Sequence, residues 1–299
     1  MDALRRKKRL DELLGRLGSV GTRWPARPGA KLQDHLLEMT PAVGERKHRV
    51  GFIAGCVMKP LFADVNLATV RVLAENGCEV VTPASQTCCG ALHMHNGVRE
   101  SARELAEQNI DAFLSQDLDA IVINSAGCGA ALKEYPELFP HEPAKRARAE
   151  EFAGKMRDIT EWLAEIDLKP PPHEVAQRVA YDDPCHLLHG QGVAAQPREL
   201  LRAIRGVELK EIPEADWCCG SAGIYNVVQP DLSAAILARK MPHVEASEAD
   251  IVATANPGCM IQLRAGVRGS GLPMRVMHVV ELLDWAYTGI DPESRQRRP

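Results

Sequence analysis

Short apolar runs alternate with longer amphipathic stretches from residue 49 onward. The short runs have the length of buried strands, and the longer stretches repeat apolar residues with the 3.6-residue period of a helix. The expected strands and helices of the first half, in order, are residues 50–55, 63–76, 79–82, 98–115 and 120–124. The order strand, helix, strand, helix, strand is typical of a parallel sheet with crossover helices.

The second half of the chain repeats this plan. Its expected elements are residues 178–181, 197–204, 209–212, 231–246 and 250–254. Residues 158–163 and 278–283 also resemble each other, and three consecutive prolines at 170–172 form a stiff spacer between the halves. The sequence therefore predicts an α/β protein of two tandem similar units, each a small, mostly parallel sheet with crossover helices. The predicted divisions are an N-terminal helix and linker over 1–48, a first unit over 49–172 and a second unit over 173–299.

Eight of the nine cysteines follow the same repeat. They are Cys56, Cys88, Cys89 and Cys128 in the first half, and Cys185, Cys218, Cys219 and Cys259 in the second. The two sets are offset by 129, 130, 130 and 131 residues. Alanine or valine would serve burial equally well, so thiols kept in register across a duplication indicate ligands of a metal or cluster. The ninth cysteine, Cys78, lies outside the repeat, and we expect it to be buried and inert.

Most of the repeated thiols come shortly after a predicted strand. The carboxyl ends of the strands border the ligand crevice in an open parallel sheet, so we expect the four thiols of each half to converge. Glycine beside a thiol permits a positive φ and brings backbone N–H groups toward sulfur. We expect Gly90 and Gly220 to support the ligands in this way, and His93 and His186 to form hydrogen bonds near the sulfurs rather than to bind metal.

A set of four thiolates suits zinc and iron–sulfur clusters alike. Structural zinc sites usually combine two C-x2-C pairs, whereas each half of this chain has one adjacent pair and two isolated cysteines. This spacing favours iron–sulfur clusters, of the [4Fe-4S] type and up to two in number. Zinc in one or both halves and a thiol redox centre remain the alternatives.

The net charge, the composition and the apolar content of the chain argue against some classes of protein. A net charge of −4 and few aromatic residues offer neither the basic field nor the stacking surface that nucleic acid requires. The N-terminus lacks an apolar signal core, and no stretch reaches about eighteen apolar residues, so a reducing cytoplasm is the expected location. The basic residues 5–9 favour a solvated helix, with peripheral binding to an anionic membrane or a partner as the alternative.

Six segments around the cysteines resemble a known family. They are residues 55–57 (GCV), 86–93 (QTCCGALH), 124–129 (NSAGCG), 182–187 (DDPCHL), 216–223 (DWCCGSAG) and 256–260 (NPGCM). They resemble the duplicated cysteine-rich (CCG) domain, and most of all the version in the iron–sulfur subunit of glycolate oxidase. That version is related to lactate-oxidation iron–sulfur proteins and to the cysteine-rich component of heterodisulfide reductase. The likeness covers about residues 49–288.

The resemblance implies an iron–sulfur subunit of an oxidoreductase complex. In such a complex a flavin subunit oxidises a 2-hydroxy acid such as glycolate or lactate, and the iron–sulfur subunit passes the electrons onward. The resemblance also implies a cytoplasmic complex at the cytoplasmic face of the membrane. No catalytic residue is expected on this chain, which alone would not turn over substrate.

Two departures from the relatives matter. Domains of the heterodisulfide reductase type carry a further cysteine for unusual clusters where this chain has Ala131 and Gln262, which argues for simpler clusters and against disulfide reduction. The glycolate oxidase subunit resembles a fusion with an N-terminal ferredoxin-like part, whose cysteine runs do not occur here. The alternatives are a shortened version, a split gene product whose partner is a separate ferredoxin-like protein, and a chain with a misplaced start. The alternative function is a non-redox scaffold with structural zinc that recruits a flavoprotein, and a thiol reductase acting through the Cys-Cys pairs ranks last.

Overall fold

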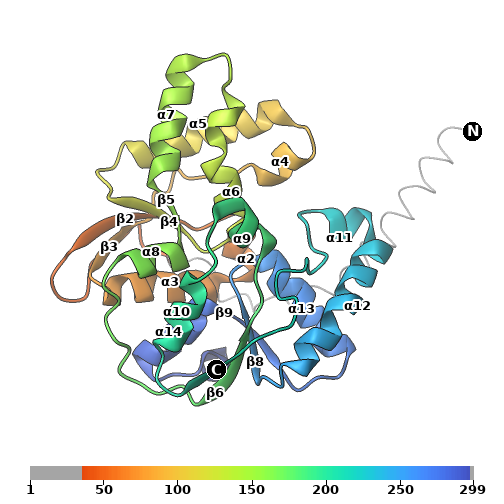
Figure 1. Ribbon diagram of the computed structural model, residues 1–299. Helices are drawn as coiled ribbons and strands as arrows, with labels where there is room; N and C mark the ends of the chain where they lie inside the picture. The colour runs from red at the N-terminus through yellow and green to blue at the C-terminus, as the bar shows by residue number, and fades with distance from the viewer. Residues whose placement is uncertain (1–35, 297–299) are drawn as a thin grey trace, which may run out of the picture.

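The computed structural model describes residues 36–296, whose strands form two separate sheets (Figure 1). The first sheet has the order β1-β3-β2-β4-β5. Its strands are β1 (Met39–Thr40), β2 (His48–Ile53), β3 (Cys78–Val81), β4 (Ala120–Ile123) and β5 (Met156–Asp158). Neighbouring strands run parallel except β1, which pairs antiparallel with β3 at the edge.

The second sheet is wholly parallel and has the order β7-β6-β8-β9. Its strands are β6 (Gln177–Tyr181), β7 (Val207–Lys210), β8 (Ile251–Thr254) and β9 (Arg275–His278). This order repeats the order β3-β2-β4-β5 of the first sheet. The predicted fold class, an α/β chain of two tandem similar units with mostly parallel sheets, is therefore confirmed.

Helices connect the strands in both halves. In the first half they are α2 (Met58–Leu61), α3 (Ala63–Glu75), α4 (Ala91–His95), α5 (Arg99–Leu114), α6 (Ala126–Lys133), the 3-10 helix η1 (Tyr135–Leu138), α7 (Pro143–Lys155) and α8 (Ile159–Glu165). In the second half they are α9 (Cys185–Gln191), α10 (Gln196–Arg202), α11 (Tyr225–Val228), α12 (Pro230–Ala246), α13 (Pro257–Gly269), α14 (Val279–Thr288) and α15 (Pro292–Gln296).

All the strands and helices that the hydrophobic pattern predicted are present, with ends that differ by two residues or fewer. The pattern missed the three-residue strand β5, the strand β9, and β1, which lies in the segment expected to be a linker. It also gave no prediction for several helices, namely α6, α7, α8, α9, α13 and α14. The predicted N-terminal helix lies in residues 1–35, outside the described residues. The unit boundaries after residues 48 and 172 stay predictions.

The main core lies between the two halves. Buried side chains of β2 and α3 belong to one continuous apolar cluster with those of β6, β8 and α14. Helix α14 packs against α3, and α8 packs against α10, so each half supplies the helix that covers the other. Arg71 of α3 donates two hydrogen bonds of 2.8 Å to the buried carboxylate of Asp284 on α14. The two halves therefore fold as one body.

The first half carries an extra helical layer. Between α6 and β5 the chain forms η1 and α7, which pack together and cover α5 through Phe152 and Tyr135. The corresponding connection between α13 and β9 is a short turn at residues 270–274. In Figure 1 α7 and α5 accordingly form a lobe that projects beyond the first sheet.

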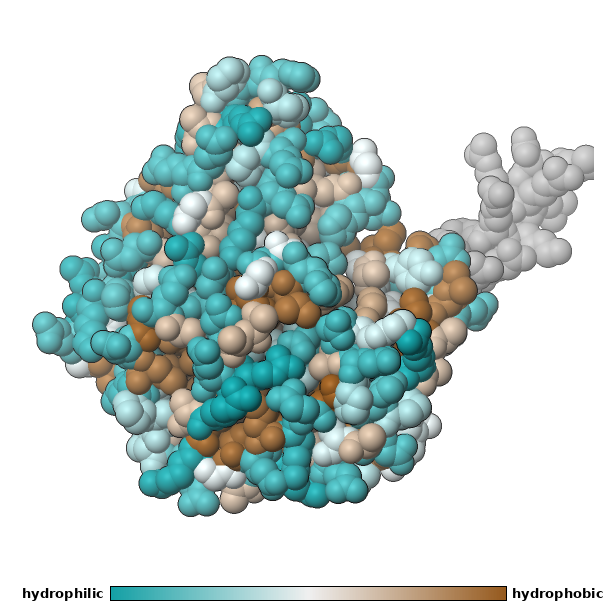
Figure 2. Space-filling view, in the orientation of Figure 1, coloured by the Kyte–Doolittle hydropathy of each residue, from teal (hydrophilic) through white to brown (hydrophobic). Residues whose placement is uncertain are grey.

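The face drawn in Figure 2 is mostly hydrophilic, with apolar residues in scattered patches. Within residues 36–296, no helix is both long enough and apolar enough to cross a membrane.

A buried polar network joins the ends of the two central strands of the first sheet. Asn124, which follows β4, donates hydrogen bonds to Asn66 Oδ1 (2.9 Å) and Thr69 Oγ1 (2.8 Å) on α3. Asn66 Nδ2 in turn donates to the carbonyl of Ala54 (2.8 Å), which follows β2. The three polar side chains are fully buried, so the network fixes the backbone that leads into Cys56.

We expect Asn66→Ala to destabilise the protein by roughly 2 kcal/mol, because it leaves buried partners unsatisfied. The thermal unfolding midpoint should fall by about 5 °C. The control is Asn96→Ala, which removes an exposed side chain that bonds only the carbonyl of Leu92, and its midpoint should stay within about 1 °C of the parent. Equal shifts in the two variants would contradict a structural role for the network.

Candidate metal centres

The cysteines of each half follow the carboxyl ends of three parallel strands. In the first half Cys56 lies between β2 and α2, the pair Cys88 and Cys89 lies between β3 and α4, and Cys128 lies in the first turns of α6 after β4. The second half places its four cysteines in the same way after β6, β7 and β8. Parallel strands bring these loops to one edge of each sheet.

The sulfurs of the first half contact one another in chain order. Cys56 Sγ lies 3.3 Å from Cys88 Sγ, Cys88 contacts Cys89, and Cys89 contacts Cys128. The structure therefore brings all four predicted thiols of this half together.

The second half forms the same arrangement. Cys185 contacts Cys218, Cys218 contacts Cys219, and Cys219 Sγ lies 3.3 Å from Cys259 Sγ. Cys78, by contrast, is fully buried in β3 among apolar core residues, as expected, and burial raises the pKa of its thiol to about 11.

Each group of thiols is open on one side and closed on the other. Cys56 is exposed, whereas Cys89 is 3% exposed. In the second group Cys185 and Cys218 are half-buried, whereas Cys219 is 4% exposed. Each group thus has an outer edge that a reactant or partner can approach and an inner edge shielded from water.

Close contact between thiols shifts their pKa values in opposite directions. Hydrogen bonds from Cys56 and Cys89, and from the Gly90 N–H, lower the pKa of Cys88, whereas the hydrogen bond to Cys88 and then burial raise the pKa of Cys56. The same contacts lower the pKa of Cys218 and raise that of Cys185. In the first group the hydrogen bond from Cys89 also lowers the pKa of Cys128. Four thiolates in contact would require a compensating positive charge.

The donor set fits a metal centre in type and number, since each group offers four sulfurs and metals bind the thiolate form. Within residues 36–296, however, no three His, Cys, Asp or Glu side chains are arranged as they stand to hold a metal ion. The 3.3 Å contacts are also shorter than the separation of about 3.8 Å between the sulfurs of a tetrahedral zinc site with bonds of about 2.3 Å. The thiols must therefore move apart to bind a metal; Cys56 in the first contact is exposed, whereas Cys219 and Cys259 in the second are both buried.

The predicted glycines lie where their backbone reaches sulfur. Gly90 has φ 76° and donates its N–H to Cys88 Sγ (3.5 Å), and Gly220 has φ 86° and donates to Cys218 Sγ (3.3 Å). A Cβ atom on Gly220 would also come within 2.6 Å of the Ser233 carbonyl oxygen. Both a left-handed backbone and close packing therefore require glycine at position 220.

The predicted histidines lie beside the thiols. The Nδ1 atom of His186 is 3.7 Å from Cys185 Sγ, and its ring stacks on that of His95 with a centroid separation of 5.8 Å. His93 lies on α4, directly after the Cys88–Cys89 loop, and its Nδ1 is buried with no hydrogen-bond partner among the described residues. Both histidines therefore lie near the thiols, whereas their predicted role as hydrogen-bond partners rather than metal ligands stays a prediction.

Sequence reasoning missed the side chains that hold the Cys-Cys loops. In the first half, Asn109 on α5 donates to the carbonyl of Cys88 (3.0 Å) and accepts from the N–H of Thr87 (2.9 Å). The hydroxyl of Tyr135 donates to the carbonyl of Cys89 (3.0 Å). An asparagine in a helix gives no sequence signal for such a role.

The second half holds its Cys-Cys loop with a buried cation. Lys240 on α12 is 2% exposed, and its Nζ donates to the carbonyls of Ala215 (2.9 Å) and Trp217 (2.5 Å) while it pairs with the carboxylate of Asp182. Burying an ion pair costs free energy unless its hydrogen bonds are satisfied, and here the two carbonyls accept those of Lys240. Lys240 thereby holds the backbone that leads into Cys218. Its place in the predicted helix 231–246 is the one sequence signal that could have revealed it.

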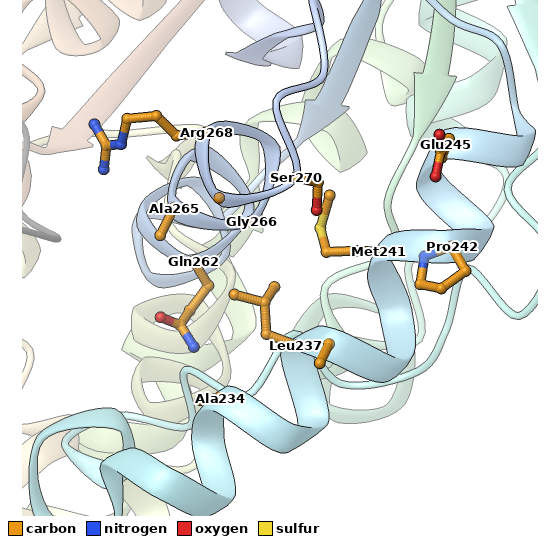
Figure 3. Close-up of a pocket in the computed structure, with 12 residues that line it drawn as sticks. Ala234, Leu237, Met241, Pro242, Glu245, Gln262, Ala265, Gly266, Arg268 and Ser270 are labelled. Atoms are coloured by element: carbon orange, nitrogen blue, oxygen red, sulfur yellow. The ribbon is translucent and has the colours of Figure 1, made fainter.

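A hollow of about 570 Å³ lies between α12 and α13 (Figure 3). Leu237, Met241 and Gln262 line it, and the amide of Gln262 donates to the carbonyl of Cys219 (3.3 Å) and to Ser233 Oγ (2.8 Å). No cysteine lines this hollow. The hollow is therefore separate from the second group of thiols, although Gln262 contacts both the hollow and the Cys219 carbonyl.

Comparison with known proteins places the repeat in a family. The cysteine-rich (CCG) domain family matches residues 50–133 and 179–264. A protein of Bacillus subtilis named probable glycolate oxidase iron-sulfur subunit is 41% identical over 285 residues, covering 94% of this chain and 64% of the relative. Lactate utilization protein A of Geobacillus kaustophilus is 33% identical over 237 residues, covering 79% of this chain and 98% of that protein.

A third relative is a component of the fumarate reductase (CoM/CoB) of Methanothermobacter marburgensis, which is 36% identical over 244 residues, covering 80% of this chain and 47% of the relative. The chain thus spans less than two thirds of the length of two of these relatives. A crystal structure of a hypothetical protein from Helicobacter pylori shares the fold, with a TM-score of 0.57 and 10% identity over 88% of this chain and 53% of that one.

Each matched region contains one group of four thiols in mutual contact, and the two regions together account for more than half of the chain. This chain belongs to the cysteine-rich (CCG) domain family, with the domain present twice.

Proposed function

We propose that this chain is the electron-transfer iron–sulfur subunit of a complex that oxidises glycolate or a related 2-hydroxy acid such as lactate. The observation that carries the proposal is the pair of four-thiol groups, each with its sulfurs in mutual contact at the carboxyl ends of parallel strands. The names of the relatives, a glycolate oxidase iron-sulfur subunit and a lactate utilization protein, support the substrate class.

Each half, 49–172 and 173–299, would hold one cluster of the [4Fe-4S] type through its four cysteines. The cluster would supply a centre that takes up and releases one electron. The protein supplies the rest: buried Cys89 and Cys219 exclude water from the inner edge, and the N–H groups of Gly90 and Gly220 stabilise negative charge on sulfur. Oxidation of the hydroxy acid to the oxo acid releases two electrons and takes place on the partner.

The proposed partner is a flavin-containing 2-hydroxy-acid dehydrogenase subunit, with a separate ferredoxin-like protein as a second electron carrier. The exposed sulfur of Cys56 and the half-buried Cys185 and Cys218 support electron exchange at the open edges. We place the complex in the cytoplasm, at the cytoplasmic face of the membrane. No side chain of this chain is assigned to substrate chemistry.

Anaerobically purified protein should contain about eight iron and eight sulfide per chain, since each [4Fe-4S] cluster contributes four of each. Cys88→Ser and Cys218→Ser should each halve both contents, because each removes one ligand of a different group. Cys78→Ser is the matched control, since Cys78 lies outside both groups, and it should keep the full content. Zinc without sulfide in the parent protein would instead establish the scaffold with structural zinc.

We expect Gly220→Ala to lose about half of the iron, whereas Gly90→Ala retains most of it. Both positions have a positive φ, which costs an alanine about 1 kcal/mol. Only at Gly220 does the added Cβ come within 2.6 Å of backbone, because the nearest atoms at Gly90 are 3.5 Å away. Iron analysis and the visible spectrum of both variants test the difference, and equal losses would show that packing behind the second loop is unimportant.

A further inference from the structure

The helices that carry thiols of the two groups pack against each other at the boundary between the halves. Helix α6, which carries Cys128, packs against α9, which begins at Cys185, and the two helices lie next to each other in Figure 1. The N–H of Ala126 donates to the carbonyl of Ala255 (3.1 Å), which joins the start of α6 to the end of β8. The ends of the two sheets therefore share one contact region.

Asn256 spans this boundary with its side chain. Its Nδ2 donates to Cys259 Sγ (3.5 Å), and its Oδ1 accepts the backbone N–H of Gly127 (3.1 Å), the residue before Cys128. One amide thus contacts a sulfur of the second group and the peptide next to a sulfur of the first. Among the hydrogen bonds of the described residues, this is a direct polar link between the two groups.

The side chain of Asn256 is not used to cap its own helix. Asn256 is the N-cap residue of α13, a position where asparagine normally accepts a backbone N–H of the first turn, yet no such bond is present. Ser125 occupies the same place in the first half, three residues before Cys128, and its side chain bonds Cys128. The duplication therefore kept a donor to the fourth sulfur, and in the second half this donor also reaches across the boundary.

Small residues permit this close approach. Gln191 of α9 donates to the carbonyl of Ala126 (2.9 Å), and a Cβ atom on Gly129 would come within 2.6 Å of its Nε2. A Cβ atom on Gly127 would lie 3.5 Å from Asn256 Oδ1. Gln191 thus supplies a second amide at the same boundary that makes no bond to sulfur in the structure.

We propose that Asn256 is a positioning residue that couples the two cluster sites, so that they act as one redox pair. This inference rests on the proposed function, because it requires an iron–sulfur cluster in each half. With clusters bound in both halves, the coupling would concern the transfer of one electron from the reduced site to the oxidised site, with no bond formed or broken and no proton moved. The N–H bond to Cys259 stabilises the more negative, reduced form of the second site, and the bond from Gly127 fixes the amide in the orientation that makes this possible.

The test compares four variants of the full chain, loaded anaerobically, by redox titration followed by electron paramagnetic resonance. Asn256→Ala removes both bonds, and Asn256→Asp keeps the shape but turns a carboxylate oxygen toward Cys259. Gln191→Ala removes an amide at the boundary without touching sulfur, and Ser125→Ala removes a sulfur donor that does not cross the boundary. Iron content and thermal unfolding are measured for each.

We expect Asn256→Ala to shift the electron distribution between the two sites at least tenfold toward the first, which equals about 59 mV for one electron. The magnetic interaction between the two reduced sites should weaken in the same variant. Asn256→Asp should shift the distribution further in the same direction, since its charge disfavours the reduced second site. Gln191→Ala should leave the distribution unchanged, and Ser125→Ala should shift it in the opposite direction while it keeps the interaction.

The outcomes separate the two proposals. Parent protein without iron and sulfide would overturn the proposed function and the coupling together. Two clusters whose potentials and interaction do not respond to Asn256→Ala would overturn the coupling alone. If Asn256→Ala fails to hold the second cluster, the isosteric Asn256→Asp decides, and an unchanged electron distribution in it overturns the proposal.

Discussion

Four sulfur atoms in mutual contact are the constraint on which the rest of this structure depends. Neutral thiols can lie side by side, but four thiolates repel one another, so the ligand form of each group exists only with a compensating positive charge. The carboxyl ends of the parallel strands place three loops with cysteines at one edge of each sheet. Backbone N–H groups there donate to Cys88 Sγ and Cys218 Sγ. The inner sulfurs of Cys89 and Cys219 are buried, whereas Cys56 at the outer edge of the first group is exposed.

Both halves keep the four thiols, but the residues that surround each group differ between the halves. The first half holds its Cys-Cys loop with the neutral amide of Asn109 and the hydroxyl of Tyr135, whereas the second uses the ammonium of Lys240, neutralised by Asp182, and the amide of Gln262. The first half also covers α5 with α7, which the second half lacks, and the hollow between α12 and α13 lies open there. The two groups of four thiols therefore have different electrostatic surroundings, which would give clusters bound there different reduction potentials.

The sequence predicted most of the fold because the informative signals are local. Apolar runs before each cysteine marked β2, β4, β6 and β8, and glycine beside the cysteine pairs marked the left-handed turns at Gly90 and Gly220. The register of the repeat then predicted which thiols meet. Short strands such as β5 gave no period, and the supporting contacts of Asn109 and Lys240 depend on which helix face meets which loop. That information belongs to tertiary packing, which a single sequence does not display.

The contact between the halves was beyond sequence reasoning for the same reason. The segment 256–260 shows an asparagine before a cysteine, and the local pattern favours an N-cap, which Asn256 indeed occupies. Its side chain instead accepts the Gly127 N–H at the start of α6 and donates to Cys259 Sγ. Of the nearby Gly127 and Gly129, only Gly129 would bring an added Cβ closer than ordinary contact, to Gln191. The polar link between the two groups of thiols thus comes from a side chain that the sequence motif alone would assign to capping a helix.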